Sequence, residues 1–537
     1  MTRQLAGSSA LVPIGSDVRG PVIIVFLVFV GISLLWLFTL SAAQDDGSEK
    51  LYLADRSLSP LLNGVALAGE LMSVVTLLAV PGAIALFGYD GFVFAIDGML
   101  ALGIVFLLAR RIRDSGRYTL GGVFALRVPG RAPRIAAIVV ALAVTIPLLL
   151  IQLRAAGIAA SHLIGLPTIE AQAACTVLMG LLVACCAVVA DLRGSSTIHV
   201  VKVLVALLTL AALVVLALSE FGGDPGELLS TAAAKSLDPE GYFTPGSWQS
   251  GPFPRLDGLA MHLVEITGIA VLPQLILRVG ASRSGRAARR SVAVAGAVLG
   301  AFTLLLVMTG FAAVAVVGGD GVGTADANGQ SATFLLASSL FPQGSPARGV
   351  LITAVACLFF LALLTTVTSV TFAAGVTVAE DGADSASTSG RAGRAPGLRT
   401  VIVLLCVVVL SLSAVTYRFF VDFLMVFVVS VAASAIFPAL VLSLFWARFN
   451  RRGLLWSVYG GLLATSVLML TSPNVSGSPF SLFPDQDFVL FPFMTPGLFS
   501  VPLSFLLGWL GGVTGPAEPV SCHGTDVPPS RHHVFGS

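Results

Sequence analysis

Charged residues are scarce in this sequence. Only 11% of the 537 residues are Asp, Glu, Lys or Arg, whereas soluble proteins contain about 25%. So few charges cannot cover a water-exposed surface, which excludes a soluble enzyme, a nucleic-acid-binding protein and a disordered scaffold. The formal net charge of +2 likewise gives no field that would attract a polyanionic partner such as nucleic acid.

The motifs of catalysis, metal binding and ATP use are also missing. The six cysteines show neither the spacing of metal ligands nor that of a disulfide framework. The chain has no GxxxxGK[ST] phosphate loop, which argues against direct use of ATP. Residues 319–329 resemble a calcium loop in composition but lack its ligand spacing. We therefore expect a protein that is not an enzyme and needs no cofactor.

Long apolar stretches make up most of the chain instead. Hydrophobic residues account for 56% of it, and its mean hydropathy is +0.95. A membrane-spanning helix needs about 20 apolar residues, and thirteen stretches meet this requirement. They are 20–43, 61–88, 91–109, 135–165, 168–190, 195–218, 257–277, 291–318, 349–380, 400–417, 419–446, 453–471 and 490–512. The sequence thus predicts an all-α polytopic membrane protein with about 13 transmembrane helices.

The basic residues predict how these helices are oriented. The loops on one side of the membrane carry 22 Arg and Lys residues, and those on the other side carry six. Basic loops stay in the cytoplasm, so the N-terminus is predicted outside and the C-terminus inside the cell (plasma or inner) membrane. The first stretch ends in SAAQ, as a signal peptide can, but it is longer than a signal core and ends on the cytoplasmic side. We expect it to be retained as a helix.

Two of the stretches are interrupted by helix-breaking residues. The second contains Gly69 and Pro81, and the seventh contains Gly268 and Pro273. Interrupted helices at matching places in the two halves of a transporter mark its binding site. The seventh stretch comes five stretches after the second. Because five is an odd number, the two halves of the protein would cross the membrane in opposite directions. The pattern predicts a five-plus-five inverted repeat, with breaks near 69–73 and 268–273 facing each other.

The rest of the organisation follows from the loop lengths. Connections are short except for 219–256, 319–348 and 381–399, which leaves no room for a separate soluble domain. Residues 331–341 are predicted to form a short interfacial helix. The expected parts are an outer tail (1–19), a leading helix (20–43), the ten-helix inverted-repeat transport core (61–446), two additional helices (447–512) and a disordered cytoplasmic tail (513–537).

Four sequence blocks carry a resemblance to a known family. They are LYLADRSLSPLLNGVALAGELMSVVTLLAVPGAIALFGYDG (51–91), RDSGRYTLGGVFALR (113–127), LPQLILRVGASRSGRAARRS (272–291) and TTVTSVTFAAGVTVAED (365–381). With them the chain resembles the solute:sodium symporter family over about 20–512, most of all its cation/acetate (monocarboxylate) permease branch. The resemblance implies a leucine-transporter-like fold and coupled uptake of a small solute and a cation.

The ninth stretch contains candidate oxygen ligands for a cation. Ala362, Thr365, Thr366 and Ser369 fall at i, i+3, i+4 and i+7, so they share one helix face. Adjacent hydroxyls and a carbonyl suit a hard cation such as Na⁺. Alternatively, the hydroxyls bond to their own helix, as Ser and Thr in membranes commonly do. The family resemblance implies a Na⁺ site formed by the main-chain oxygens of Gly69, Met72 and Ala362 and the hydroxyls of Thr365 and Thr366.

Ionisable residues inside spans are costly and often mark a transport pathway. Glu70 could attract the cation, hold a proton or face a water-filled vestibule. Asp97 and Glu265 are similar candidates on weaker grounds. The Arg154 guanidinium could bind a carboxylate in bidentate fashion, snorkel outward or pair with an intramembrane acid.

The resemblance also implies that residues at the two breaks line the solute path, although small-residue packing explains them equally well. The candidate substrate-binding residues are Glu70, Ser73, Thr76, Gln152, Arg154, Thr267 and Gly268.

Together these features predict a secondary active symporter that works by alternating access. It would couple Na⁺ influx to uptake of a small organic solute, with a monocarboxylate such as acetate as the first candidate. Its partners would be the solute, Na⁺ and the lipid bilayer. The alternatives are another solute (an amino acid, a vitamin or a sugar), proton coupling through Glu70, and a solute sensor, against which the lack of an output domain argues.

Overall fold

The structure is a computed structural model, and it describes residues 17–42, 52–166, 168–189, 191–248, 253–387, 397–416, 421–477, 481–483 and 485–515. The regular elements in these ranges are all helices. Most of the predicted outer tail (1–19) and of the predicted cytoplasmic tail (513–537) lies outside the described residues.

Membrane-length helices dominate the described part of the chain. Eleven helices are long and apolar enough to cross a membrane, and two bent helix pairs bring the total to 13 if each pair is one span. This confirms the all-α polytopic fold. The long helices are α1 (Arg19–Ala42), α5 (Tyr89–Asp114), α7 (Arg131–Ile164), α8 (Ile169–Val189), α9 (Leu192–Glu220), α13 (Gly285–Val317), α16 (Pro346–Ser387), α17 (Leu398–Val415), α20 (Arg451–Leu470), α21 (Gly497–Thr514) and a span made of α18 (Val421–Val431), a π-helical turn η2 (Ala432–Ile436) and α19 (Phe437–Phe445).

The two bent pairs are the interrupted stretches that the sequence predicts. Helices α3 (Pro60–Leu71) and α4 (Val74–Phe87) meet at 58°, and α11 (Pro254–Ala270) and α12 (Pro273–Gly280) meet at 42°. At the first break the Ser73 side chain caps α4 by accepting a hydrogen bond from the backbone N–H of Thr76. At the second break Pro273 has no N–H to continue the helix. Pro81, in contrast, lies inside α4 without ending it.

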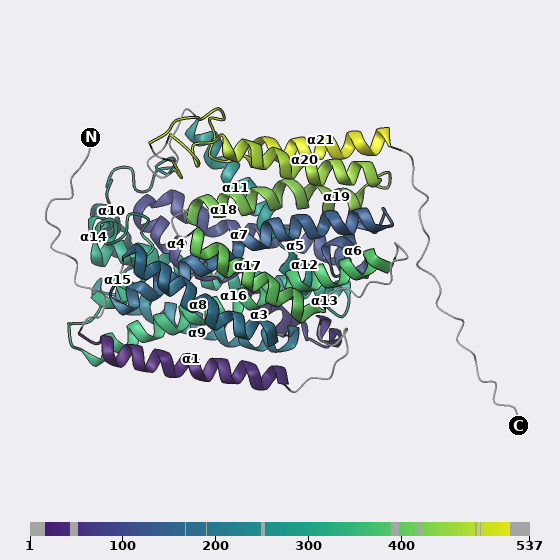
Figure 1. The fold of residues 1–537 in the computed structure, drawn as a ribbon. Helices are drawn as coiled ribbons and strands as arrows, with labels where there is room; N and C mark the ends of the chain where they lie inside the picture. Colours follow the sequence, from purple (N-terminus) through teal and green to yellow (C-terminus); the bar gives the residue numbers. More distant parts are fainter. Residues whose placement is uncertain are drawn as a thin grey trace, which may run out of the picture.

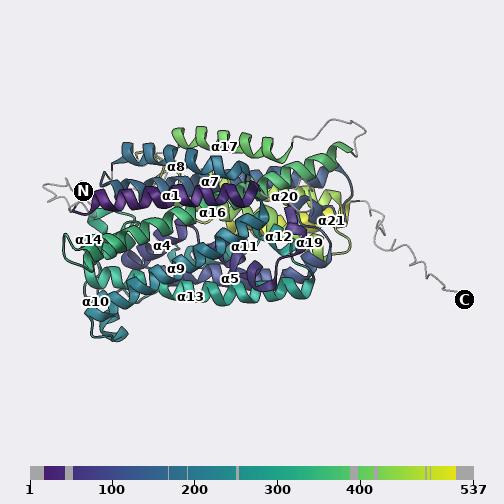
Figure 2. The ribbon, with the colours of Figure 1, turned by 90° about the horizontal axis from the view of Figure 1, so that it is seen from below.

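Each half of the core begins with one of these bent pairs. The first half comprises α3–α4, α5, α7, α8 and α9, and the second comprises α11–α12, α13, α16, α17 and the α18–α19 span. Helix α1 lies along one edge of the bundle, and α20 and α21 lie along the opposite edge (Figures 1 and 2). The edge-to-face contact of Phe26 and Phe360 joins α1 to α16. This is the arrangement of one helix before the core and two after it.

Short helices lie at the two ends of the bundle. Figure 1 shows α10 (Pro225–Ala234), α14 (Gly319–Ala325) and α15 (Ala332–Ser339) at one end and α6 (Leu120–Phe124) at the other. Helix α15 falls within the predicted helix 331–341. A single turn of 3₁₀ helix, η1 (Ala54–Arg56), precedes α3.

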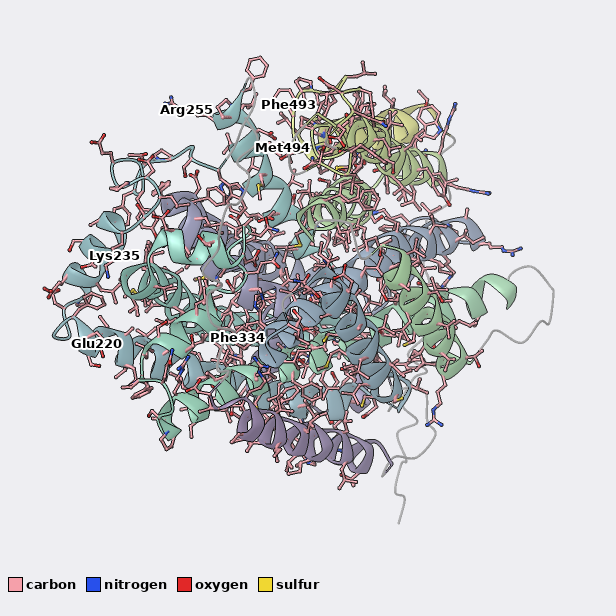
Figure 3. All side chains as sticks on the ribbon, turned by 60° about the vertical axis from the view of Figure 1, so that its left-hand side comes forward. Glu220, Lys235, Arg255, Phe334, Phe493 and Met494 are labelled. Atoms are coloured by element: carbon pink, nitrogen blue, oxygen red, sulfur yellow. The ribbon has the colours of Figure 1, made fainter. Side chains whose placement is uncertain are left out.

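The last helix begins later than the apolar stretch 490–512 suggests. Helix α21 starts at Gly497, because Pro492 and Pro496 interrupt the run before it. The preceding residues cover the start of α11 instead (Figure 3). There the carboxylate of Asp257 accepts hydrogen bonds from the backbone N–H groups of Met494 (2.7 Å) and Thr495 (3.0 Å).

Candidate functional site

A cavity of about 110 Å³ lies between the two helix breaks. Its lining includes Glu70 and Ser73 from the first break and Leu272 and Gln274 from the second. The breaks therefore face each other, as the sequence predicts. Most of the remaining lining is apolar, from α4, α5, α7, α13 and α18.

Four of the cavity-lining residues carry buried polar atoms that make no hydrogen bond within the described part of the chain. These atoms are Glu70 Oε2, Asp97 Oδ1, Gln152 Oε1 and Thr366 Oγ1. Buried polar atoms of native proteins are normally paired. Unpaired groups that converge on one cavity are available to a ligand.

Glu70 is held in a buried network behind the cavity. Its Oε1 accepts hydrogen bonds from Arg278 Nε of α12 and Ser369 Oγ of α16. His199 Nε2 of α9 lies 3.3 Å from the same oxygen. The Arg278 side chain is 1% exposed and also donates to Ser196 Oγ (2.9 Å). The Glu70–Arg278 ion pair therefore ties α3, which precedes the first break, to α12, which follows the second.

Lys202 lies in the middle of α9 and is fully buried. Its Nζ donates hydrogen bonds to the main-chain oxygens of Gly69 (2.6 Å) and Met72 (3.0 Å). Both oxygens lie where α3 ends, and Gly69 O also accepts a hydrogen bond from the N–H of Met72 (3.2 Å). They are also two of the five predicted Na⁺ ligands. In this structure the Lys202 ammonium group is hydrogen-bonded to both of these oxygens.

The other three predicted Na⁺ ligands lie on α16. Thr365 Oγ1 donates to the carbonyl oxygens of Leu361 (2.7 Å) and Ala362 (3.2 Å) within its own helix. Thr366 instead lines the cavity, and its hydroxyl makes no hydrogen bond within the described residues. Ser369, on the same face, is bound to Glu70. The five-ligand sodium site stays a prediction.

The predicted substrate-binding residues separate into two groups. Four of them line the cavity: Glu70, Ser73, Thr76 and Gln152. Arg154, Thr267 and Gly268 are not among its lining residues. Thr267 Oγ1 donates to Leu263 O of its own helix, and Gly268 packs against the main chain of Val429. The packing alternative describes these last two residues better than a solute-lining role.

A second acidic group borders the cavity. The carboxyl groups of Asp97 and Glu265 are close enough to interact, and both line the cavity. Asp97 Oδ2 lies 2.7 Å from His262 Nδ1. Two carboxyl groups this close do not both ionise readily in a buried site.

Sequence reasoning missed three members of the buried network. Arg278 is one of the 22 basic residues that the sequence assigns to cytoplasmic loops, but it lies in α12 and is buried. Lys202 and His199 lie three residues apart on α9 within an otherwise apolar run. The signal that could have found Lys202 is its rarity, because it is one of three lysines in the chain and lies in the middle of a span.

The family can now be identified. The model of the sodium:solute symporter family matches residues 51–461 of the chain. A "Monocarboxylic acid transporter" from Corynebacterium glutamicum is 31% identical over 508 residues, which is 91% of this chain and 91% of that protein. The chain belongs to the sodium:solute symporter family.

Membership in the sodium:solute symporter family makes this protein a multi-pass membrane transporter rather than an enzyme, and it implies Na⁺ and a small solute as transported partners. Another relative, the "Uncharacterized symporter YwcA" of Bacillus subtilis, is 30% identical and covers 91% of this chain and 93% of its own.

Solved structures confirm the leucine-transporter-like fold. A Na⁺-coupled sialic acid symporter, in a substrate-bound outward-open state, aligns with a TM-score of 0.68 at 14% identity and covers 93% of this chain and 98% of its own. A nucleobase-cation-symport-1 family transporter, in a closed conformation, aligns with a TM-score of 0.52 at 14% identity, covering 87% and 96%.

Proposed function

We propose that this protein is a secondary active symporter that imports a small monocarboxylate, such as acetate, together with a cation. The observation that carries the proposal is the cavity between the two helix breaks, where buried polar atoms without partners meet an apolar wall. Rocking of one helix bundle against the other would open this cavity to each side of the membrane in turn.

The composition of the cavity supports a monocarboxylate. Its wall is largely aliphatic and aromatic, with Phe94, Leu148, Phe302 and Met425 among the lining residues. Such a wall suits a solute with one polar end and a short apolar body. A sugar would need hydrogen-bond partners around its whole circumference, and this lining does not supply them.

The helix ends at the break support an anionic solute. Helix α4 begins at Val74, so its amide N–H groups and the positive end of its dipole lie at the cavity. Half-helix N-termini hold anionic groups of substrates in transporters of this architecture. The amide of Gln152 supplies a further donor. The hydroxyls of Ser73 and Thr76 bond to each other (3.0 Å), and the Thr76 hydroxyl donates to Leu71 O (3.1 Å).

Family membership supports Na⁺ as the coupling ion. A specific observation supports a second candidate, the proton. The neighbouring carboxyl groups of Asp97 and Glu265 line the solute cavity and together offer a place for a proton that reaches the same space as the solute.

Uptake into proteoliposomes tests the function. Labelled acetate, an amino acid and a sugar are each offered under an inward Na⁺ gradient, an inward proton gradient or neither, with empty liposomes as blanks. We expect acetate to accumulate under at least one cation gradient. Accumulation of only the amino acid or the sugar would contradict the monocarboxylate assignment.

Gln152→Leu links the function to the cavity. Loss of a buried polar contact of about 1–3 kcal/mol should weaken apparent solute affinity roughly 5- to 150-fold. The matched control is Ser161→Ala on the same helix, because the Ser161 hydroxyl bonds to Ile158 O and does not line the cavity. Equal effects of the two substitutions on the KM for acetate would place the solute elsewhere.

A further inference from the structure

The end of helix α3 forms a position suited to one cation. The main-chain oxygens of Gly69 and Met72 converge there. They lie at the C-terminal, negative end of a half-helix, where oxygen atoms and dipole both favour a positive charge. In transporters with broken helices, such ends coordinate the coupling cation.

In this protein the position is filled by the chain itself. Lys202 Nζ lies 2.6 Å from Gly69 O and 3.0 Å from Met72 O, and its side chain is fully buried. The bonds join segments 133 and 130 residues apart. An ammonium group and Na⁺ carry the same charge and use the same oxygens. One pair of oxygens therefore cannot serve both at once.

The packing around Lys202 holds α9 close to this position. A Cβ atom added to Gly69 would lie 2.7 Å from His199 Nδ1, so α3 and α9 approach each other as closely as a glycine permits. Lys202 begins one turn further along α9, which places its stem beside the break. The nearest carboxylate, Glu70, is already paired with Arg278. It does not supply a second negative charge that would let Na⁺ bind next to the ammonium.

We propose that the Lys202 ammonium is a tethered substitute for Na⁺ at the first helix break, so that solute import by this protein does not require Na⁺. This inference rests on the proposed symport function and excludes Na⁺ from its two candidate coupling cations. A fixed ammonium keeps the charge that the carbonyl oxygens need. It does so without taking an ion from solution.

Measurements of Na⁺ binding to the purified full-length protein test the proposal that Lys202 substitutes for Na⁺. Saturable binding of ²²Na⁺ and the melting temperature in NaCl against choline chloride are measured for the wild type and for Lys202→Ala. We expect neither binding nor a melting shift in the wild type. Lys202→Ala opens the position, so it should gain saturable ²²Na⁺ binding and a higher melting temperature in NaCl. Saturable binding in the wild type that Lys202→Ala leaves unchanged would overturn the proposal.

Two further variants serve as controls, one for the size of the side chain at position 202 and one for the loss of a lysine hydrogen bond elsewhere in the protein. Lys202→Met removes the charge but keeps the stem in place, so it should not gain ²²Na⁺ binding. Lys235→Ala removes another lysine-to-carbonyl bond, from Lys235 Nζ to Ala315 O (2.7 Å), away from the break. It should behave as the wild type. If Lys202→Ala does not fold, Lys202→Ser opens the same position. A gain of ²²Na⁺ binding in Lys202→Ala, Lys202→Met and Lys235→Ala alike would contradict the role assigned to Lys202.

Transport gives the second readout. Wild-type uptake of labelled acetate at fixed pH should be unchanged when Na⁺ is replaced by choline, whereas Lys202→Ala should become stimulated by Na⁺, about tenfold or more if one ion-binding step is restored. A strict Na⁺ requirement of the wild type would overturn the proposal. If no solute of the panel is transported under any gradient, the proposed function fails, but the ²²Na⁺ measurement still decides the role of Lys202.

Discussion

Two adjacent threonines on α16 differ in what their hydroxyl groups contact. Thr365 bonds to Leu361 O and Ala362 O of its own helix. Thr366 lines the cavity, and its hydroxyl has no partner within the described residues. A hydroxyl that satisfies its own helix adds little to ligand binding. A buried hydroxyl without a partner costs free energy until a ligand arrives.

Substitution of each threonine should therefore have a different result. We expect Thr366→Val to raise the KM for the transported solute roughly 5- to 150-fold, the equivalent of about 1–3 kcal/mol for a lost polar contact. Thr366→Ser keeps the oxygen and should stay close to the wild type. Thr365→Val is the matched control and should change the KM less than Thr366→Val. A larger effect at Thr365 would mean that the ligand does not bind against Thr366.

Charge explains why Lys202 and Na⁺ exclude each other. Two unit charges about 4 Å apart repel by about 4 kcal/mol at an effective dielectric constant of 20. The Lys202 ammonium is within hydrogen-bonding distance of both oxygens that Na⁺ would need. Na⁺ binding there would thus have to overcome this repulsion and displace two hydrogen bonds.

The buried ion pair of Glu70 and Arg278 is a second group of charges beside the first helix break. Breaking such a pair by removing one partner commonly costs about 3–5 kcal/mol, because it leaves a buried charge without compensation. The pair involves one helix from each of the two broken spans. It connects α3 to α12 across 208 residues of sequence.

At the scale of elements, close packing at glycines fixes how the helices meet. Gly268 lies near the end of α11, and a Cβ atom there would lie 2.4 Å from the carbonyl oxygen of Val429 in α18. Backbone cannot move aside as a flexible side chain can. This glycine therefore sets the distance between α11 and the α18–α19 span.

Gly268→Ala should push these two helices apart. We expect a loss of stability of about 1–3 kcal/mol, as for other overpacked sites, measured as a lower melting temperature in detergent. Gly103→Ala on α5 is the control, because a Cβ atom there meets nothing within 4 Å. It should be neutral or slightly stabilising, since Ala favours helices over Gly by about 1 kcal/mol. A Gly268→Ala protein as stable as the Gly103→Ala protein would contradict the packing role.

At the scale of the whole molecule, the two ends of the bundle differ in composition. The end with α6 carries the Arg-rich segments 110–134 and 278–290, whereas α10 and the 219–248 segment lie at the other end (Figure 1). The N-terminal end of α1 and the C-terminal end of α21 also lie at opposite ends of the bundle. An odd number of spans requires this arrangement. Which end faces the cytoplasm is still a prediction from the basic residues.

Cysteine labelling tests the predicted orientation. In a background without native cysteines, Glu240→Cys should react with a membrane-impermeant maleimide on intact cells, and Arg117→Cys should react only after permeabilisation. Both side chains are exposed in the structure, so access to the reagent depends on the side of the membrane. Labelling of Arg117→Cys alone in intact cells would reverse the topology.

The number of spans and the positions of the breaks could be predicted from the sequence because their causes are local. A spanning helix is recognised from a run of apolar residues, and Pro273 removes the N–H of its own residue. The sequence prediction misses the later start of α21 at Gly497, although Pro492 and Pro496 signal it, because the run 490–512 contains no charged residue. Ser73, Thr76 and Gln152 line the cavity and could be singled out because they lie beside a predicted break or inside an apolar run, whereas their contact with a solute stays a prediction.

Sequence alone therefore determined the membrane class, the two broken spans and the family resemblance. Tertiary structure decided which side chains meet at the breaks. Arg278 reaches Glu70 and Lys202 reaches Gly69 only because α9, α12 and α3 pack together. A lysine within an apolar run can snorkel, pair or bind a carbonyl. Only the position of a neighbouring helix end selects among these, and here it places a fixed ammonium on the oxygens predicted to bind sodium.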